Sequence, residues 1–328
     1  MTAGAAVALD ALMSSIQADL DLAETEMQRM LASTTEPVRS LLEHISSFRG
    51  KQLRPALVLV AGKMFGDLGR DHHRVAAIVE SIHVATLVHD DILDESTMRR
   101  GVETVNKKVG CETAVLLGDY LFATAFKEAA LLESRFPACD LSEVVAVVCT
   151  GEIQQVHNRN NLDLSEETYF EIIERKTAAL YAGALRNGAH LSGASEEQAA
   201  ALARFGTKFG TAFQIVDDIL DLMGDEARVG KSLGTDLDKA KMTLPLLRLR
   251  DQASRADRTK LEDAIRSHAA DARTRIRPLL VEYGGLDSAQ ATADALVHDA
   301  QSELESLPDV PERNLLRQAA KYVVSRDR

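Results

Sequence analysis

The chain has 328 residues, of which 45% are hydrophobic and 27% are charged, and its formal net charge is −12. A general nucleic-acid-binding protein would be basic, so this composition argues against that class. An acidic surface does not attract an anionic substrate unaided, so any phosphate chemistry must depend on local cations or bound metal.

The cysteines and the N-terminal segment indicate the compartment. Cys111, Cys139 and Cys149 form no CxxC pattern and are odd in number, so neither a disulfide framework nor a zinc site is indicated. The first residues, MTAGAAVALDALMSS, lack the basic segment and apolar core of a signal peptide. No apolar run approaches the roughly 20 residues that span a bilayer. We therefore expect a cytoplasmic protein without a transmembrane segment.

Apolar residues recur at three- and four-residue spacing along most of the chain, which predicts helices. In chain order the predicted helices are 7–31, 38–47, 55–65, 73–94, 111–134, 141–158, 167–190, 195–222, 243–253, 257–269, 272–283, 287–306 and 311–325. The sequence shows no strand alternation and no Asn-Gly hairpin signal. Breaks are predicted at Gly- and Pro-containing segments such as Phe136-Pro137, whereas Pro55 and Pro245 fit first helical turns.

The organisation of these helices predicts the fold class. No fixed-period repeat is present, and no linker of low complexity divides the chain. We therefore predict an all-α fold with a single domain over residues 1–328, in which the helices pack as a bundle around a central cavity.

Two copies of the pattern DDxxD end long apolar-periodic segments, in HDDILDESTMRRG and in QIVDDILDLMGD. The first and last Asp of each copy share one face of a helix, which pairs Asp90 with Asp94 and Asp217 with Asp221. Carboxylates so placed raise one another's pKa unless a cation lies between them. Mg²⁺ prefers oxygen ligands and completes its shell with water and phosphate oxygens. A lone copy is equally well explained as a solvated helix end, but two copies predict a magnesium site.

A metal-bound diphosphate also needs cationic partners. The candidates are Lys51, Arg54, Arg99, Arg100, Lys176, Lys231 and Lys241. Arg grips phosphate oxygens with a planar fork and Lys acts as a point charge, although a single basic residue is more often a surface charge. His83, seven residues before Asp90, is interpreted either as a core histidine or as a ligand. Thr177 and Gln214 are polar in apolar segments and therefore need partners, which a site would supply.

Together these segments resemble the trans-polyprenyl diphosphate synthases over nearly the whole chain. The matching segments are GKQLRPAL, HDDILDESTMRRG followed by ETVN, LLGDYLFATAF, ERKTAALYAGAL, GTAFQIVDDILDLMGDEARVGKSLGTDLDKAKMTLPLL and KYVVSRDR. Glu103 is a small departure, because most relatives would have proline there. The resemblance implies the isoprenoid synthase fold, a homodimer, and head-to-tail condensation of isopentenyl diphosphate with an allylic diphosphate to a trans-polyprenyl diphosphate.

The resemblance also implies a role for each candidate residue. The metal site would bind three magnesium ions through Asp90, Asp91, Asp94, Asp217, Asp218 and Asp221. Isopentenyl diphosphate would be bound by Lys51, Arg54, His83 and Arg100. The allylic diphosphate would be held by Arg99, Lys176, Thr177, Gln214, Lys231 and Lys241. Catalysis would rest on Asp90, Asp94, Asp217, Lys176, Thr177 and Gln214, without a side-chain nucleophile. Loops 96–104 and 224–240 would exclude water as lids.

The residues before the first motif bear on product length. Ala85 and Thr86 lie about one turn below Asp90, and Ser81 lies one turn lower. A helical turn rises about 5.4 Å, close to one extended isoprene unit, so each turn can gate another unit. All three residues are small, which predicts an open tunnel and a medium-to-long product. The alternative is that they only permit helix packing. Phe122, Phe126 and Phe136 are alternative tunnel floors.

Three other functions are weighed against this prediction. One is a short-chain synthase that makes farnesyl or geranylgeranyl diphosphate. Another is a class I terpene cyclase, which would carry an Asn/Ser/Glu-type second motif and would need no second diphosphate site. The third is a non-catalytic subunit of a heteromeric synthase, which would have lost some of the aspartates or basic residues.

Overall fold

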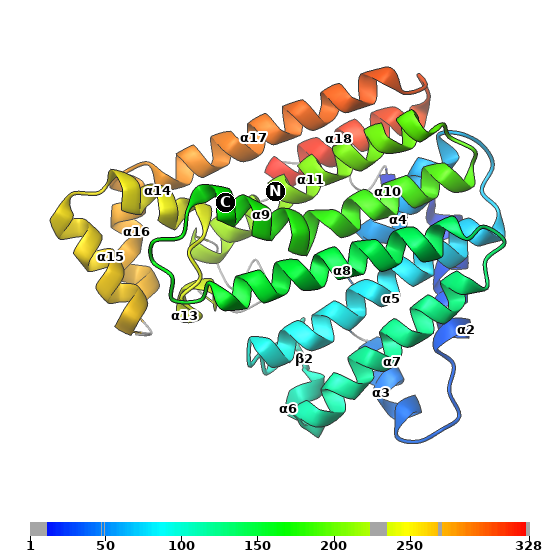
Figure 1. The fold of residues 1–328 in the computed structure, drawn as a ribbon, viewed down its shortest axis with the longest axis horizontal. Helices are drawn as coiled ribbons and strands as arrows, with labels where there is room; N and C mark the ends of the chain where they lie inside the picture. The colour runs from blue at the N-terminus through cyan, green and yellow to red at the C-terminus, as the bar shows by residue number, and fades with distance from the viewer. Residues whose placement is uncertain (1–11, 47, 49, 224–234, 268–270, 326–328) are drawn as a thin grey trace.

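The computed structural model describes residues 12–46, 48, 50–223, 235–267 and 271–325, and nearly all of its regular structure is helical (Figure 1). The α-helices are α2 (Gln17–Leu31), α3 (Val38–Ser46), α4 (Leu53–Lys63), α5 (Arg70–Leu93), α6 (Val105–Val109), α7 (Cys111–Ala130), α8 (Phe136–His157), α9 (Glu166–Ile173), α10 (Ala179–Leu191), α11 (Glu196–Met223), α13 (Thr235–Asp238), α14 (Leu244–Gln252), α15 (Arg255–Ser267), α16 (Ala272–Glu282), α17 (Gly285–Glu303) and α18 (Pro311–Ser325). The all-α prediction is therefore confirmed.

The helices are arranged around α5, α8, α10 and α11. Helix α10 packs against α4 and α11, and α17 lies along α11. Figure 1 shows α17 and α18 along one long edge, α2 and α7 toward the opposite edge, and α14 to α16 at one end. One buried apolar cluster contains residues from Leu12 to Val323, and a smaller one joins α3, α5 and α7. The large core thus connects both ends of the described chain.

Helix α10 approaches its neighbours at the distance of backbone contact. A Cβ at Gly188 would overlap the carbonyl oxygen of Val58 in α4, and a Cβ at Gly206 of α11 would lie 2.7 Å from the Cα of Ala182. Only glycine leaves room for such an approach. Because α4 and the segment before α10 carry expected substrate residues, this contact sets the separation between the two halves of the site.

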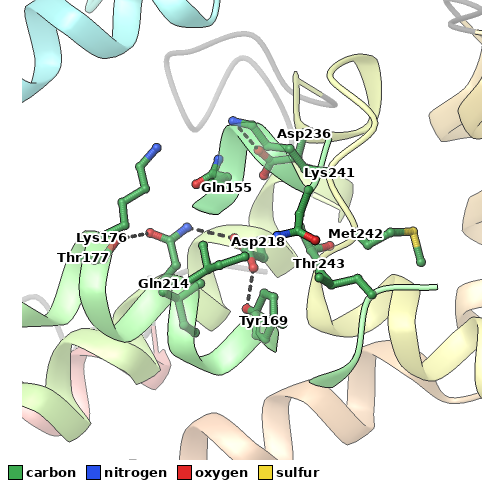
Figure 2. A pocket seen from close by; sticks show the side chains of 14 residues that line it. Gln155, Tyr169, Lys176, Thr177, Gln214, Asp218, Asp236, Lys241, Met242 and Thr243 are labelled. Atoms are coloured by element: carbon green, nitrogen blue, oxygen red, sulfur yellow. Dashed lines mark hydrogen bonds and ion pairs between the residues drawn. The ribbon is translucent and has the colours of Figure 1, made fainter. Parts of the chain in front are cut away.

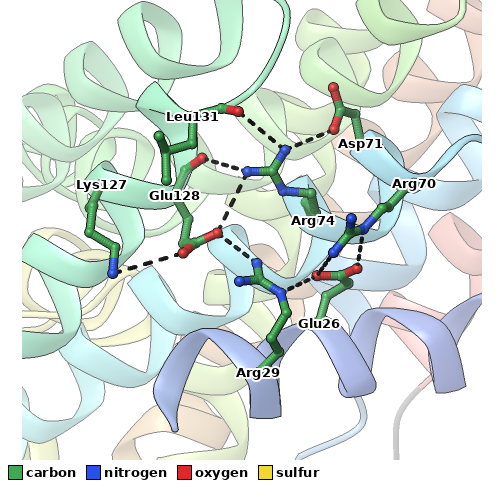
Figure 3. A network of polar contacts seen from close by, with 8 residues as sticks. All are labelled: Glu26, Arg29, Arg70, Asp71, Arg74, Lys127, Glu128 and Leu131. Carbon is green, nitrogen blue, oxygen red and sulfur yellow. Dashed lines mark hydrogen bonds and ion pairs between the residues drawn. The ribbon is translucent and has the colours of Figure 1, made fainter. Parts of the chain in front are cut away.

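Charged side chains join α2, α5 and α7 (Figure 3). Glu128 of α7 lies 2.6 Å from Arg29 and 3.6 Å from Arg74, and Glu26 of α2 lies 2.6 Å from Arg70. The hydrogen bond from Arg29 lowers the pKa of the Glu128 carboxyl. An exposed ion pair contributes little by itself, but here two largely buried carboxylates share their arginines and so join three helices into one network.

The structure differs from the sequence prediction around residue 100. Met98–Arg99 (β1) pairs antiparallel with Val102–Glu103 (β2), although no hairpin was expected. Arg100 (φ 52°) and Gly101 (φ 80°) both adopt the left-handed conformation that a two-residue hairpin turn requires. Arg-Gly is not an ordinary signal for this turn, which explains why the sequence pattern missed it.

Two other local predictions are also corrected. Helix α8 begins at Phe136 with Pro137 in its first turn, so Phe136-Pro137 starts a helix instead of breaking one. The predicted helix 167–190 is divided by a π-helical turn, η1 (Glu174–Ala178), between α9 and α10. A short 3₁₀ turn, η2 (Leu304–Ser306), follows α17.

Across the part of the chain that the structure describes, no helix has the length and apolar character needed to cross a membrane.

Candidate active site

The first aspartate motif occupies the last turn of α5. The carboxylate of Asp90 lies 3.8 Å from the Nζ of Lys176. Asp94, the C-cap of the helix, lies 3.1 Å from Arg159 and 3.3 Å from Lys241. Burial raises the pKa of Asp90, and Lys176 acts in the opposite direction. The two outer carboxylates of the motif therefore share one cation-lined face.

The second motif meets the first through a lysine. The backbone N–H of Asp236 donates to Asp221 at 3.2 Å, and the Asp236 carboxylate lies 3.4 Å from Lys241, which also pairs with Asp94. Burial lowers the pKa of Lys241, but Asp236 and Asp94 offset this effect and raise the pKa above its ordinary value. Asp217 lies half-buried one turn before Asp221. The two motifs thus face one cleft between α5, α8 and the C-terminal end of α11.

The middle aspartate of each motif is bound within the protein. Asp91 is buried and accepts hydrogen bonds from Nε and Nη2 of Arg99 at 2.8–3.0 Å. Asp218 is buried and accepts from the Tyr169 hydroxyl at 2.6 Å and from Gln214 Nε2 at 2.8 Å. Burial raises the pKa of both carboxyls. Asp91 and Asp218 therefore lie beside the expected metal site with their oxygens already paired, and Arg99 is paired with Asp91.

The hydrogen bonds from Tyr169 through Asp218 to Gln214 form a polar chain, and a cavity of about 110 Å³ lies beside it (Figure 2). Its wall includes Thr177, whose hydroxyl donates to Gln214 Oε1 at 2.9 Å. Thr177 and Lys176 belong to the π-helical turn η1, a feature often found at functional sites. A Cβ at Gly151 of α8 would lie 2.5 Å from the Lys176 amide nitrogen. The close contact between α8 and η1 therefore positions both side chains at the cleft.

A second cationic cluster surrounds His83 of α5. Nη1 of Arg54 lies 3.1 Å from His83 Nε2, and the Arg54 guanidinium stacks over the ring of Tyr181. Arg100 lies beside Gly50 and donates to the Phe48 carbonyl. Burial lowers the pKa of His83 well below its ordinary value, and the neighbouring arginines lower it further. Burial and the neighbouring arginines therefore both favour the uncharged form of His83.

The other expected residues are Lys51, Lys231 and the two loops that were expected to be lids. Lys51, near the start of α4, donates to the Tyr322 hydroxyl at 2.5 Å. Lys231 lies outside the described residues, as do residues 224–234 of the expected second lid. Loop 96–104 contains the β1–β2 hairpin. The segment expected to be the first lid is thus a short hairpin that carries Arg99 and Arg100.

Sequence reasoning missed several residues that the fold brings to the cleft. Glu152 of α8 pairs with Lys176, and Arg159 follows the same helix. Tyr169 comes from α9 and Asp236 from α13. Glu152 had a usable signal, because it is a charged residue within the apolar-periodic segment 141–158. The other three depend on long-range contacts that local spacing does not reveal.

The donor atoms in the cleft suit magnesium. Within the ranges that the structure describes, no three acidic, His or Cys side chains form a ready-made metal centre. Mg²⁺ often binds through one or two carboxylates together with water and substrate phosphates. Asp90 and Asp94 already hold cationic groups at 3.1–3.8 Å, so this half-site fits a metal whose shell a diphosphate completes.

An all-α bundle with two facing aspartate motifs and two separate cationic clusters defines an enzyme class that acts on diphosphate substrates. The polyprenyl synthetase family model matches residues 35–282. Octaprenyl diphosphate synthase of Escherichia coli K12 is 36% identical over 301 residues, which cover 91% of this chain and 93% of that protein. Geranylgeranyl diphosphate synthase of Methanosarcina mazei is 36% identical over 284 residues, which cover 85% of this chain and 86% of that protein.

The structural comparison agrees with the sequence comparison. Polyprenyl synthase from Caulobacter crescentus CB15, complexed with calcium and isoprenyl diphosphate, superposes with a TM-score of 0.93 at 33% identity and covers 97% of this chain and 98% of its own. The chain belongs to the polyprenyl synthetase family. It is an all-α prenyltransferase of isoprenoid biosynthesis, and the family generally uses a divalent metal. The resemblance is confirmed, and the cyclase alternative is set aside.

Proposed function

We propose that this prenyltransferase condenses isopentenyl diphosphate head to tail with an allylic diphosphate in a magnesium-dependent reaction. The observation that carries the proposal is the presence of two separate anion sites. Lys176 and Lys241 lie on the aspartate motifs of the cleft, whereas Arg54 and Arg100 form a cluster with His83. Two diphosphate substrates need two such sites, and a non-catalytic subunit has no need of either.

The outer aspartates are the proposed metal ligands. Asp90 and Asp94, with Asp217 and Asp221 across the cleft, would hold magnesium, which as a Lewis acid stabilises the departing diphosphate. Lys176 and Lys241 are the proposed diphosphate ligands from the protein. Each lysine pairs with a motif carboxylate, at 3.8 Å for Lys176 and 3.3 Å for Lys241, and with one further carboxylate, Glu152 or Asp236. A motif carboxylate that binds metal no longer pairs with its lysine, so the lysine can turn toward phosphate oxygens while its second carboxylate stays beside it.

The polar chain beside the cavity is suited to stabilising a carbocation. The hydroxyl hydrogen of Thr177 is directed toward Gln214, and Gln214 in turn donates to Asp218. This order of donors leaves the lone pairs of the Thr177 oxygen for a positive centre in the cavity. A preorganised partial negative charge of this kind stabilises an allylic cation without forming a covalent bond. The double bond of isopentenyl diphosphate then attacks the cationic carbon from which diphosphate has departed, and the proton lost from the adduct goes to the released diphosphate.

We propose a medium-to-long product, with Thr86 as the gate. Thr86 is half-buried on the face of Asp90, and its hydroxyl donates to the His83 carbonyl at 2.7 Å. Ala85 points about 100° away around the helix and is fully buried in the smaller core cluster with Leu117 of α7. Thr86, and not Ala85, is therefore the residue that we expect on the cleft side of α5. The likeness to a geranylgeranyl diphosphate synthase supports the short-chain alternative.

One product assay tests both proposals. Wild-type protein with farnesyl diphosphate, excess labelled isopentenyl diphosphate and Mg²⁺ is expected to give products longer than geranylgeranyl diphosphate, sized by mass spectrometry. Removal of divalent metal with EDTA is expected to abolish product formation. No condensation with Mg²⁺ would contradict the reaction, whereas termination at geranylgeranyl diphosphate or earlier would contradict only the product length.

A matched pair of variants locates the gate. Thr86→Phe is expected to shorten the product by at least one isoprene unit, because the ring fills the space below Asp90. Ala85→Phe is expected mainly to destabilise the fold by about 1–3 kcal/mol, because it overpacks a full core. A product of unchanged length from a folded Thr86→Phe protein would remove this position from the tunnel wall.

We also propose that a second copy of the chain covers α7 and α8. Leu116 of α7 is 67% exposed, and Ile153 of α8 is 69% exposed. Val115, Val147 and Val156 on the same helices are also exposed. Apolar residues gathered on adjacent helices mark an interaction surface, and a two-fold homodimer is the commonest way to bury one. Ile153 follows Glu152 directly, so such a contact would support the helix that lines the cleft.

Light scattering coupled to gel filtration measures the assembly. We expect wild-type protein to show twice the 35.7 kDa mass of one chain. Leu116→Glu is expected to raise the dimer dissociation constant by about tenfold or more, because it places a charge in an apolar contact. Leu22→Glu on α2, another exposed leucine, serves as the control. A monomeric wild type, or equal effects of both variants, would contradict this surface.

A further inference from the structure

Arg159 lies two residues after the end of α8, and neither of the two proposed diphosphate sites includes it. Its Nη2 lies 3.1 Å from an oxygen of Asp94 and donates to the Leu93 carbonyl at 3.2 Å. The side chain is 22% exposed. It therefore lies against the last residues of the first motif, at the mouth of the cleft.

The guanidinium of Arg159 is only partly used by the protein. Both of its hydrogen bonds are made by Nη2, and its Nε is buried with no acceptor among the described residues. A guanidinium presents five N–H donors in a planar fork. A buried N–H without an acceptor is costly, so this side of the fork is suited to a ligand that supplies further oxygen atoms.

The backbone holds Arg159 at the cleft. Its own N–H donates to the Val156 carbonyl at 3.3 Å, and the next residue, Asn160, adopts a left-handed conformation with φ 64°. The Asn160 N–H donates to the Ala240 carbonyl at 3.1 Å. Ala240 immediately precedes Lys241, so the two cations are joined through their backbones on either side of Asp94.

The two cations beside Asp94 differ in the number of carboxylates that they contact. Arg159 and Lys241 both pair with this one carboxylate, and Lys241 has a second partner, Asp236, at 3.4 Å. Within the described ranges, Asp94 is the sole acidic partner of Arg159. If Asp94 binds metal, Lys241 keeps a carboxylate while Arg159 loses its counter-ion. A half-buried guanidinium in that position needs an anion with several oxygens, and a diphosphate matches its planar fork.

We propose that Arg159 is a further binding residue for the diphosphate group of the allylic substrate. This inference rests on the proposed function of the cleft, and it adds a third protein cation to Lys176 and Lys241. In this arrangement Arg159 pairs with Asp94 before substrate binds and with diphosphate oxygens afterwards.

Calorimetry with inorganic pyrophosphate at a fixed Mg²⁺ concentration tests the proposal directly. Arg159→Gln is expected to weaken pyrophosphate binding by about tenfold to a hundredfold, the size expected for charge-assisted hydrogen bonds. Arg159→Lys keeps the charge without the fork, so an intermediate loss is expected. Arg135→Gln is the matched control, because Arg135 is an exposed arginine at the opposite end of α8. The control is expected to bind as wild type does.

Steady-state kinetics provide a second measure. Arg159→Gln is expected to raise the KM for the allylic substrate and to leave the KM for isopentenyl diphosphate unchanged. Thermal melting verifies that each variant is folded, and if Arg159→Gln melts early, the comparison rests on Arg159→Lys.

Two results would overturn the inference. One is wild-type pyrophosphate affinity in the folded variants, whatever happens to activity. The other is an unchanged KM for the allylic substrate together with activity at lower Mg²⁺, because Arg159 would then be only a counter-ion of Asp94. Absence of condensation by the wild-type protein contradicts the proposed function instead, and the pyrophosphate titration distinguishes the two failures.

Discussion

Asp90→Asn is expected to lower kcat/KM by about 10²–10³-fold, comparable to the loss of one preorganised electrostatic group in an active site. The amide keeps the shape of the carboxylate but removes the charge that would bind magnesium opposite Lys176. Burial already raises the pKa of Asp90 and so disfavours its charged form. The substitution is therefore expected to leave the free energy of unfolding unchanged or to raise it.

This combination separates a catalytic effect from a structural one. Product formation is measured over a range of Mg²⁺ concentrations, and unfolding is measured in urea on the same preparations. Asp71→Asn is the control on the same helix, because Asp71 lies in the first turn of α5 and pairs with Arg74 at 3.1 Å. A loss of less than tenfold in Asp90→Asn, or an equal loss in the control, would count against a metal site at this carboxylate.

Gly188→Ala is expected to destabilise the protein by about 3 kcal/mol or more, in the range of the largest single-residue effects. The added methyl group would overlap the Val58 carbonyl oxygen, which belongs to the backbone of α4 and cannot rotate away. Relief of this overlap requires α4 and α10 to separate. Arg54 lies in the first turn of α4, and Thr177 precedes α10 in the chain, so the separation also moves the two substrate sites apart.

Urea denaturation and the condensation assay measure the two consequences together. Gly66→Ala is the matched control, because the nearest atom to an added Cβ there, in Ser192, lies 4.0 Å away. The control is expected to unfold within about 1 kcal/mol of wild type. A Gly188→Ala protein of wild-type stability would show that the two helices adjust freely, and the packing explanation would then be wrong.

The fold class and the two acidic motifs could be predicted from the sequence because both depend on local spacing. Apolar periodicity reports helices directly, and four-residue spacing places Asp90 with Asp94 on one helical face. The cationic segments were also recognisable, since they adjoin these motifs or match the family pattern. The hairpin at Arg100 was missed because its turn lacks the usual residues, and the start of α8 was misplaced because Pro137 reads equally well as a break or as a first turn.

The direction in which each side chain points was decided by the tertiary structure. Asp91 is adjacent to Asp90 in the sequence, yet it is rotated onto Arg99, while Asp218 is bound by Tyr169 from another helix. Thr86 and Ala85 are small neighbours, but only Thr86 shares the face of Asp90. The sequence by itself determined an all-α chain with two acidic helix ends, because those properties repeat over a few residues. Which oxygens and cations meet, including Glu152 and Arg159, was decided only by packing, because their partners lie tens of residues away.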